Sequence, residues 1–230
     1  MPQTKPFNKK LPALTRSRVQ GFTKKHLKPL PLLVVIIAST FTFANNLFLF
    51  SVSGTYIEGI ITQDTIWTLT DSPFVVSKNI TVYPNVTLTI EPSVEVKFGG
   101  EFSLIVNGKL IANGMQDKMI TFTSNKDQPG AGDWNAIEFS GIQQSMLAFC
   151  SIKYAKNGTT IKDGNVRIHN CEIGNNLENG MAIENSIVEA KNNEIARNSE
   201  NGIYITGYTQ VIIQNNTIRS NADGILLTGN

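Results

Sequence analysis

Apolar and polar residues alternate in short runs along the second half of the chain. Val166 and Ile168 are separated by one polar residue, and so are Val188 and Ala190. Alternation over three to five residues, interrupted by Asn and Gly, predicts short β-strands joined by tight turns. The period is two residues and not the 3.6 of an amphipathic helix, so this half of the chain should be all-β.

The strand pattern itself repeats about every 22 residues between Ser145 and Asn230. Two markers define the period: the isoleucines Ile152, Ile173, Ile195 and Ile218, and the glycines Gly158, Gly180, Gly202 and Gly224. A fixed period of this length indicates stacked units, none of which can bury its apolar face alone. Three short strands and three turns fit in one unit. A leucine-rich repeat would show spaced leucines and a helix-forming stretch, which are missing here.

One position of each unit is expected to form a ladder inside the solenoid. It lies two residues before the marker isoleucine, with the same inward parity, and is occupied by Cys150, Cys171, Asn193 and Asn216. Neighbouring coils are about 4.8 Å apart, so these side chains should stack. A buried Asn there can bond turn backbone groups and the coils above and below. The Asn-Gly and Asp-Gly pairs that carry the marker glycines are expected to tolerate positive φ in the turns.

Cys150 and Cys171 would lie on adjacent coils, which brings their Cα atoms within reach of a disulfide. Side chains stacked in register are often badly oriented for the χ3 angle of a disulfide. We therefore favour a pair of free stacked thiols, with the disulfide as the alternative.

These units resemble those of right-handed parallel β-helix proteins with the pectate-lyase-like repeat. The resemblance is reinforced by the stretches at 86–92, 106–110, 120–124 and 132–134 and extends over residues 57–230. It implies an all-β, three-sheet solenoid, the right-handed parallel β-helix, with about 22 residues per coil. It is specific for fold and not for function, because lyases, hydrolases, adhesins and structural proteins all use this fold.

The first 57 residues have a different composition. They contain eight basic residues and no Asp or Glu, and a largely apolar run extends from Leu30 to Val52. At about 1.5 Å per residue, this run is long enough to cross a bilayer core of about 30 Å. The sequence predicts a basic cytoplasmic segment at 1–29 and, at 30–53, either a signal peptide or a transmembrane anchor. In both cases the remainder would be exported to the cell surface or beyond, and an uncleaved anchor would hold it at the membrane.

The first 57 residues also explain the net charge of the chain. The whole chain has a formal charge of +2, but the exported portion keeps 12 basic and all 18 acidic residues, a formal charge of −6. An acidic exported domain disfavours a nucleic-acid partner. Export would make four Asn-x-Ser/Thr sequons candidates for glycosylation, at Asn79, Asn85, Asn157 and Asn215, although an Asn- and Thr-rich solenoid also generates sequons by chance.

Glu172 and Glu194 occupy one outward position on neighbouring coils. Carboxylates about 5 Å apart repel each other unless a cation or a raised pKa intervenes. Such a pair could bind Ca²⁺ or serve as the carboxylate pair of a retaining glycosidase. The alternative is two solvated glutamates whose repulsion is softened by Lys191 and Arg197. His169 should face outward beside Lys191 without further metal ligands.

Trp134 is expected to pack at a coil corner, with sugar stacking by an exposed ring as the alternative. The last predicted strand, at 225–227, is followed by no cap over the apolar interior. We therefore expect the β-helix to be incomplete at Asn230, the alternatives being a self-capping end or end-to-end self-association.

The resemblance points to carbohydrates without assigning a catalytic residue. Hydrolases of this fold carry D-D, G-H-G and R-I-K motifs, none of which occurs here. The favoured function is a non-catalytic exported scaffold or carbohydrate-binding module, whose partner is a polysaccharide or cell-envelope glycan. One alternative is a polysaccharide lyase or glycoside hydrolase whose catalytic coils are missing or unrecognised. A second is a periplasmic metallocofactor-maturation factor.

Overall fold

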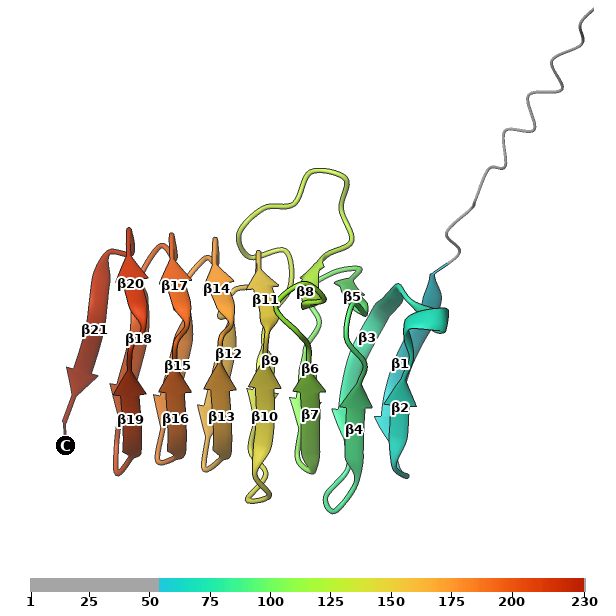
Figure 1. Cartoon of the computed structure of the whole chain (residues 1–230), viewed down its shortest axis with the longest axis horizontal. Helices are drawn as coiled ribbons and strands as arrows, with labels where there is room; N and C mark the ends of the chain where they lie inside the picture. Colours follow the sequence, from blue (N-terminus) through green and yellow to red (C-terminus); the bar gives the residue numbers. More distant parts are fainter. Residues whose placement is uncertain (1–53, 230) are drawn as a thin grey trace, which may run out of the picture. The chain divides into compact units, whose positions relative to one another are not determined.

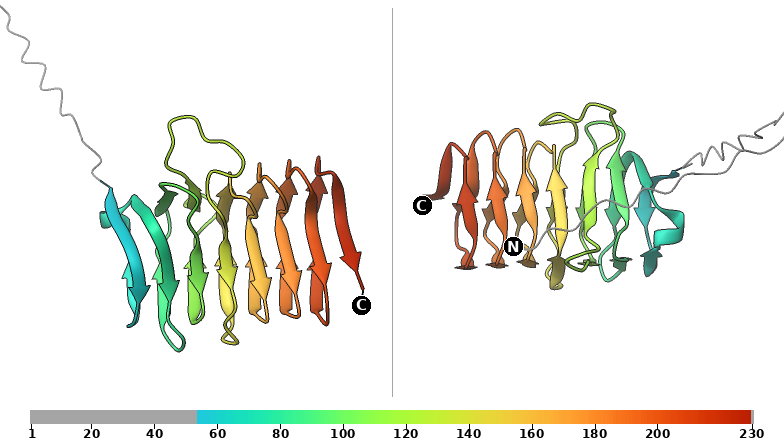
Figure 2. Two further views of the ribbon diagram at one scale, coloured as in Figure 1. Left: turned by 180° about the vertical axis from the view of Figure 1, so that it is seen from behind. Right: turned by 45° about the horizontal axis from the view of Figure 1, so that its top comes forward.

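The computed structural model describes residues 54–229, which form a row of stacked coils built from short parallel strands (Figure 1). Successive coils lie side by side in sequence order when seen from behind or tilted (Figure 2). The predicted solenoid with its period of about 22 residues is therefore confirmed. Its first strand, β1, starts slightly before the expected boundary, at Thr55.

The coils have three faces. Face 1 is a seven-stranded sheet of β2 (Thr65–Trp67), β4 (Thr87–Ile90), β7 (Lys109–Asn113), β10 (Ser145–Ala148), β13 (Asn165–His169), β16 (Ile187–Lys191) and β19 (Gln210–Gln214). Face 2 contains β5 (Glu95–Phe98), β8 (Ile120–Ser124), β11 (Cys150–Lys153), β14 (Glu172–Gly174), β17 (Glu194–Ala196) and β20 (Thr217–Arg219). Face 3 contains β6 (Leu104–Val106), β9 (Ile137–Phe139), β12 (Thr159–Lys162), β15 (Met181–Glu184), β18 (Asn201–Thr206) and β21 (Asp223–Thr228).

One long strand joins faces 2 and 3 into a single hydrogen-bonded sheet. The first half of β3 (Phe74–Val82) pairs with β5 and its second half with β6. The first strand, β1 (Thr55–Ile61), lies beside β3. A short 3-10 helix, η1 (Leu69–Asp71), directly precedes β3. The three predicted sheets thus exist as three faces, two of which are continuous at the β3 corner.

The core is produced by the alternation seen in the sequence. In β13 the buried Val166 and Ile168 alternate with three partly exposed residues, and they stack on Val188 and Ala190 of β16. Trp134 is fully buried, as predicted for packing at a corner. Its ring stacks on Phe98 with centroids 4.0 Å apart. A buried ring cannot stack on a sugar, so that alternative is excluded.

The turns differ from the expectation at the Asn-Gly pairs. Positive φ occurs one residue before the ladder position, at Phe149, Asn170, Asn192 and Asn215, and at the matching corner between faces 2 and 3. The marker glycines do not have positive φ. They are required for close packing instead, because a Cβ on Gly180 would lie 2.6 Å from the carbonyl oxygen of Gly202.

The predictions for 1–29 and 30–53 concern residues outside those that the structure describes. Within residues 54–229, none of the helical structure is long and apolar enough to span a bilayer.

Candidate functional site

Two rows of side chains cross the outer surface of face 2 where Glu172 and Glu194 were predicted to meet. Because successive strands are parallel and in register, equivalent outward residues become neighbours. The first row is Ser151, Glu172, Glu194 and Thr217, and the second is Lys153, Gly174, Ala196 and Arg219. The predicted stacking of the two glutamates is therefore confirmed.

Each glutamate has its own cationic partner in the second row. Lys153 Nζ lies 2.7 Å from Glu172 Oε2, and the Arg219 guanidinium donates to Glu194 Oε1. The expectation that Lys191 offsets the repulsion was wrong, because Lys191 points to Glu189 on face 1, at 2.9 Å. All four side chains of the two pairs are partly exposed, so their contribution to stability is small. Their main effect is to fix where the two carboxylates lie.

A hollow lies between these ion pairs because the second row contains two small residues. It is lined by Lys153, Glu172, Ile173, Gly174, Glu194, Ala196 and Arg197. Gly174 cannot be replaced by a larger residue without movement, since a Cβ there would lie 2.2 Å from the carbonyl oxygen of Ala196. The close approach of the two strands thus requires glycine at position 174.

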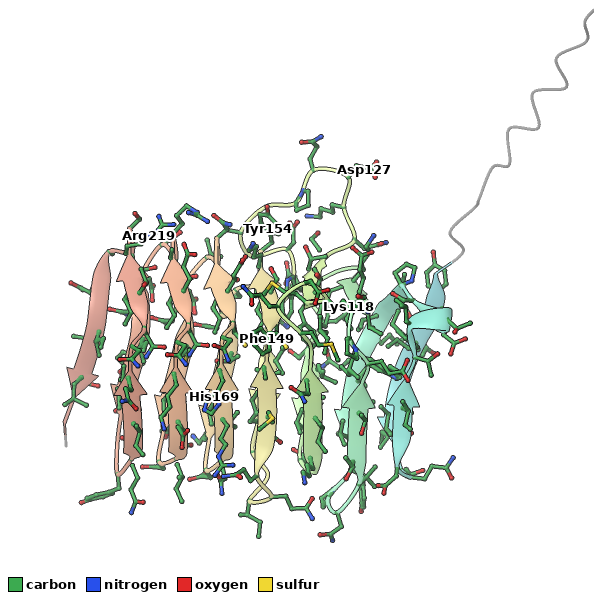
Figure 3. All side chains as sticks on the ribbon, viewed as in Figure 1. Lys118, Asp127, Phe149, Tyr154, His169 and Arg219 are labelled. Carbon is green, nitrogen blue, oxygen red and sulfur yellow. The ribbon has the colours of Figure 1, made fainter. Side chains whose placement is uncertain are left out.

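A larger groove of about 430 Å³ borders the same two glutamates on the side of the turn from face 1. Its other lining residues are Gln116, Met119, Phe149, Asn170, Cys171 and Asn192. Phe149 and His169, both labelled in Figure 3, lie on neighbouring coils, and the Phe149 N–H donates to the His169 carbonyl oxygen at 3.1 Å. We call this depression, together with the hollow, the face 2 groove.

Phe149 has an unusual backbone conformation for an aromatic residue. Its φ is 49°, in a region where Asn is common and bulky side chains are rare. The equivalent turn residues of the next three coils are all Asn, each with positive φ. A strained aromatic residue at the edge of a groove is typical of functional sites. Sequence reasoning missed it, although a Phe in the Asn position of the repeat was a visible signal.

The internal ladder predicted at Cys150, Cys171, Asn193 and Asn216 is present. The backbone N–H of Cys171 donates to Asn193 Oδ1 and that of Asn193 donates to Asn216 Oδ1, each at 2.9 Å. Two further ladders were not recognised as such: Asn176, Asn198 and Asn221 at the corner between faces 2 and 3, and Asn157, Asn179 and Asn201 at the start of face 3. These asparagines recur at nearly the same period, so the sequence contained the signal.

Both cysteines are free and buried in this structure. The N–H of Cys150 lies 3.4 Å from Cys171 Sγ. Burial, followed by the neighbouring Cys171 side chain, raises the pKa of the Cys150 thiol well above its usual value. Because the thiolate is the reactive form, the ladder should protect this thiol from modification.

We expect both cysteines to resist a bulky thiol reagent in the native protein and to react fully in denaturant. The reason is that both side chains are almost fully buried. The measurement is a colorimetric thiol titration of unreduced protein with and without denaturant, with reduced protein as the control. Finding no free thiol in the unfolded, unreduced protein would mean that the disulfide forms instead.

The four sequons are presented differently by the fold. Asn79, Asn85 and Asn215 are exposed. Asn157 accepts hydrogen bonds from Asn179, and the Thr159 of its sequon is fully buried. Asn157 is therefore less accessible than the other three asparagines, and glycosylation at all four sequons stays a prediction.

Calcium binding at Glu172 and Glu194 also stays a prediction. Among residues 54–229, no cluster of three or more His, Cys, Asp and Glu side chains is arranged to hold a metal ion. His169 faces outward beside Lys191, as expected, and its Nε2 lies 3.0 Å from Glu189 Oε1.

Comparison with known proteins gives one match. Residues 135–230 match the family model described as the right handed beta helix region. Searches of curated proteins and of solved structures returned no significant match. The matched segment includes the Asn ladders and the residues of the face 2 groove other than Gln116 and Met119. The match and the stacked parallel coils together show a right-handed parallel β-helix, which is consistent with the pectate-lyase-like superfamily.

Proposed function

We propose that this protein is an exported, non-catalytic β-helix that binds a glycan of the cell surface or envelope in the face 2 groove. The observation that carries the proposal is the composition of the groove: one aromatic ring, at Phe149, lies beside the amides of Asn170 and Asn192 and the carboxylates of Glu172 and Glu194. Amides and carboxylates supply donors and acceptors for hydroxyl groups, and an aromatic ring supplies an apolar surface for a sugar ring.

The charges of the groove favour a neutral glycan. Both glutamates already have cationic partners, Lys153 and Arg219. A polysaccharide rich in carboxylates would have to compete with Glu172 and Glu194 for these cations. Hydroxyl groups can instead bond the remaining lone pairs and the turn amides without breaking either ion pair.

The same ion pairs favour binding over hydrolysis. A retaining glycosidase needs one carboxyl group that delivers a proton to the leaving group. In the face 2 groove, a cation of the protein engages a carboxylate oxygen of each glutamate. This arrangement holds both side chains in place, so neither Glu172 nor Glu194 presents an unpaired carboxyl group to the groove.

The test is binding of the full chain to a panel of neutral polysaccharides (xylan, mannan and β-glucan) and to polygalacturonate, by pull-down and calorimetry. We expect a neutral polysaccharide to bind, and Phe149→Ala to weaken binding about tenfold, because an aromatic contact contributes about 1.5 kcal/mol. Tyr208→Ala is the matched control, since Tyr208 is the aromatic residue with an 89% exposed side chain on another turn.

Three outcomes would contradict the proposal. The first is binding by Phe149→Ala that equals that of the unchanged protein, and the second is no binding to any member of the panel. The third is an unsaturated product, detected by its ultraviolet absorbance, when polygalacturonate is incubated with the protein and Ca²⁺. That result would support the lyase alternative, with Glu172 and Glu194 as the metal ligands to test next.

A further inference from the structure

Face 1 carries a second groove, on a different side of the coils from the face 2 groove. Outward residues of β13, β16 and β19 again meet in register, as Asn165, Ile187 and Gln210 in one row and Arg167, Glu189 and Ile212 in the next. A groove of about 410 Å³ lies over them, with Gln144 at its edge. We call it the face 1 groove.

The floor of the face 1 groove is aliphatic. Ile187 and Ile212 point outward and are 52% and 54% exposed. An exposed apolar surface rimmed by polar residues can serve as an interaction site. The surrounding residues here are Gln144, Asn165 and Gln210, whose amides can both donate and accept hydrogen bonds.

Arg167 is the cation of this groove that lacks a partner. The Glu189 carboxylate is in register with it, but Glu189 Oε1 lies 2.9 Å from Lys191 Nζ and 3.0 Å from His169 Nε2. The hydrogen bond from Lys191 is the main reason that the pKa of Glu189 is lowered; burial opposes it, and the charges of Lys191, His169 and Arg167 contribute less. Within residues 54–229, the Arg167 guanidinium forms neither an ion pair nor a hydrogen bond.

These observations together define what the groove can bind. The guanidinium can take a carboxylate in a bidentate contact, which is the geometry that Arg prefers. The two isoleucines can cover an aliphatic side chain, and the amides can bond an extended backbone. We propose that the face 1 groove docks an acidic segment of another protein, in which Asp or Glu alternates with aliphatic residues.

A sugar acid shares the carboxylate but fits the floor less well. Rings of sugars pack on aromatic side chains, and the residues lining the face 1 groove include none. Arg167 together with the aliphatic Ile187 and Ile212 instead matches a peptide that carries both acidic and aliphatic side chains.

The test uses the full chain labelled with ¹⁵N and the probe peptide acetyl-Leu-Asp-Leu-Asp-Leu-amide. We expect saturable shifts of amide signals from β13, β16 and β19, and at least tenfold weaker binding by Arg167→Gln, because hydrogen bonds to charged groups are among the stronger ones. Ile212→Ser should also weaken binding while leaving the spectrum of the fold intact.

Two controls separate the face 1 groove from general charge attraction. Lys162→Gln removes a cation from face 3, where Lys162 pairs with Glu184, and should leave the affinity unchanged. The peptide with Lys in place of Asp should not bind. The proposal is overturned if Arg167→Gln binds the acidic peptide as the unchanged protein does, or if trigalacturonate shifts the same signals with higher affinity than the peptide. Neither result affects the face 2 groove, whose tests use other residues.

Discussion

Replacing Asn193 with Ala should lower the free energy of unfolding by about 3 kcal/mol or more. Asn193 Oδ1 accepts from the N–H of Cys171, and Asn193 Nδ2 donates to the carbonyl oxygen of Ile168 at 2.8 Å. All these groups are buried, and each orphaned polar group costs about 1–3 kcal/mol. Urea unfolding followed by circular dichroism would measure the change.

Gln214→Ala is the matched control for this substitution. Gln214 is a polar residue on the next coil, but it points outward and is exposed, so its loss should change stability by less than about 0.5 kcal/mol. If Asn193→Ala were as mild as Gln214→Ala, the ladder hydrogen bonds would not be stabilising the corner. Water would then have to satisfy the orphaned groups.

Replacing Gly180 with Ala should be comparably damaging, although it adds only one methyl group. The new Cβ would lie 2.6 Å from the carbonyl oxygen of Gly202 and 2.7 Å from Ile195 Cγ2. A backbone oxygen cannot move without shifting the next coil. Overpacking of this kind costs about 1–3 kcal/mol, and we expect the upper part of that range in the same urea experiment.

The repeat provides an internal control for Gly180. Gly224 occupies the same position in the last described coil, where the nearest atom to an added Cβ is Ile218 Cγ2 at 3.9 Å. Gly224→Ala should therefore be neutral or slightly stabilising, since Ala reduces the freedom of the unfolded chain. Equal losses at Gly180 and Gly224 would show that backbone conformation, and not the close approach of coils, requires these glycines.

The period and parity of the repeat were enough to predict the core. Val166 and Val188 stack as the alternation requires, because side chains of a strand alternate between its two sides and the coils repeat in register. The role of the marker glycines was not predictable in the same way. Glycine is selected both where φ is positive and where backbones approach closely, and the sequence does not distinguish these two reasons.

The candidate site was predictable only in part. The period placed Glu172 beside Glu194, but it did not indicate that Lys153 and Arg219 would reach them from the neighbouring row. Long side chains extend diagonally across a sheet, so register alone does not determine their contacts. The free guanidinium of Arg167 was missed for the same reason, since its register partner Glu189 is engaged by Lys191 instead.

The direction of the hydrogen bonds in the Asn ladders bears on how the length of such a protein can change. In the ladder of Asn176, Asn198 and Asn221, each backbone N–H donates to the side chain of the following coil. The hydrogen bonds between one coil and the next therefore repeat those between that coil and the one before it. Duplicating or deleting one unit of about 22 residues would preserve every contact of this ladder, so the molecule could lengthen or shorten in steps of about 4.8 Å.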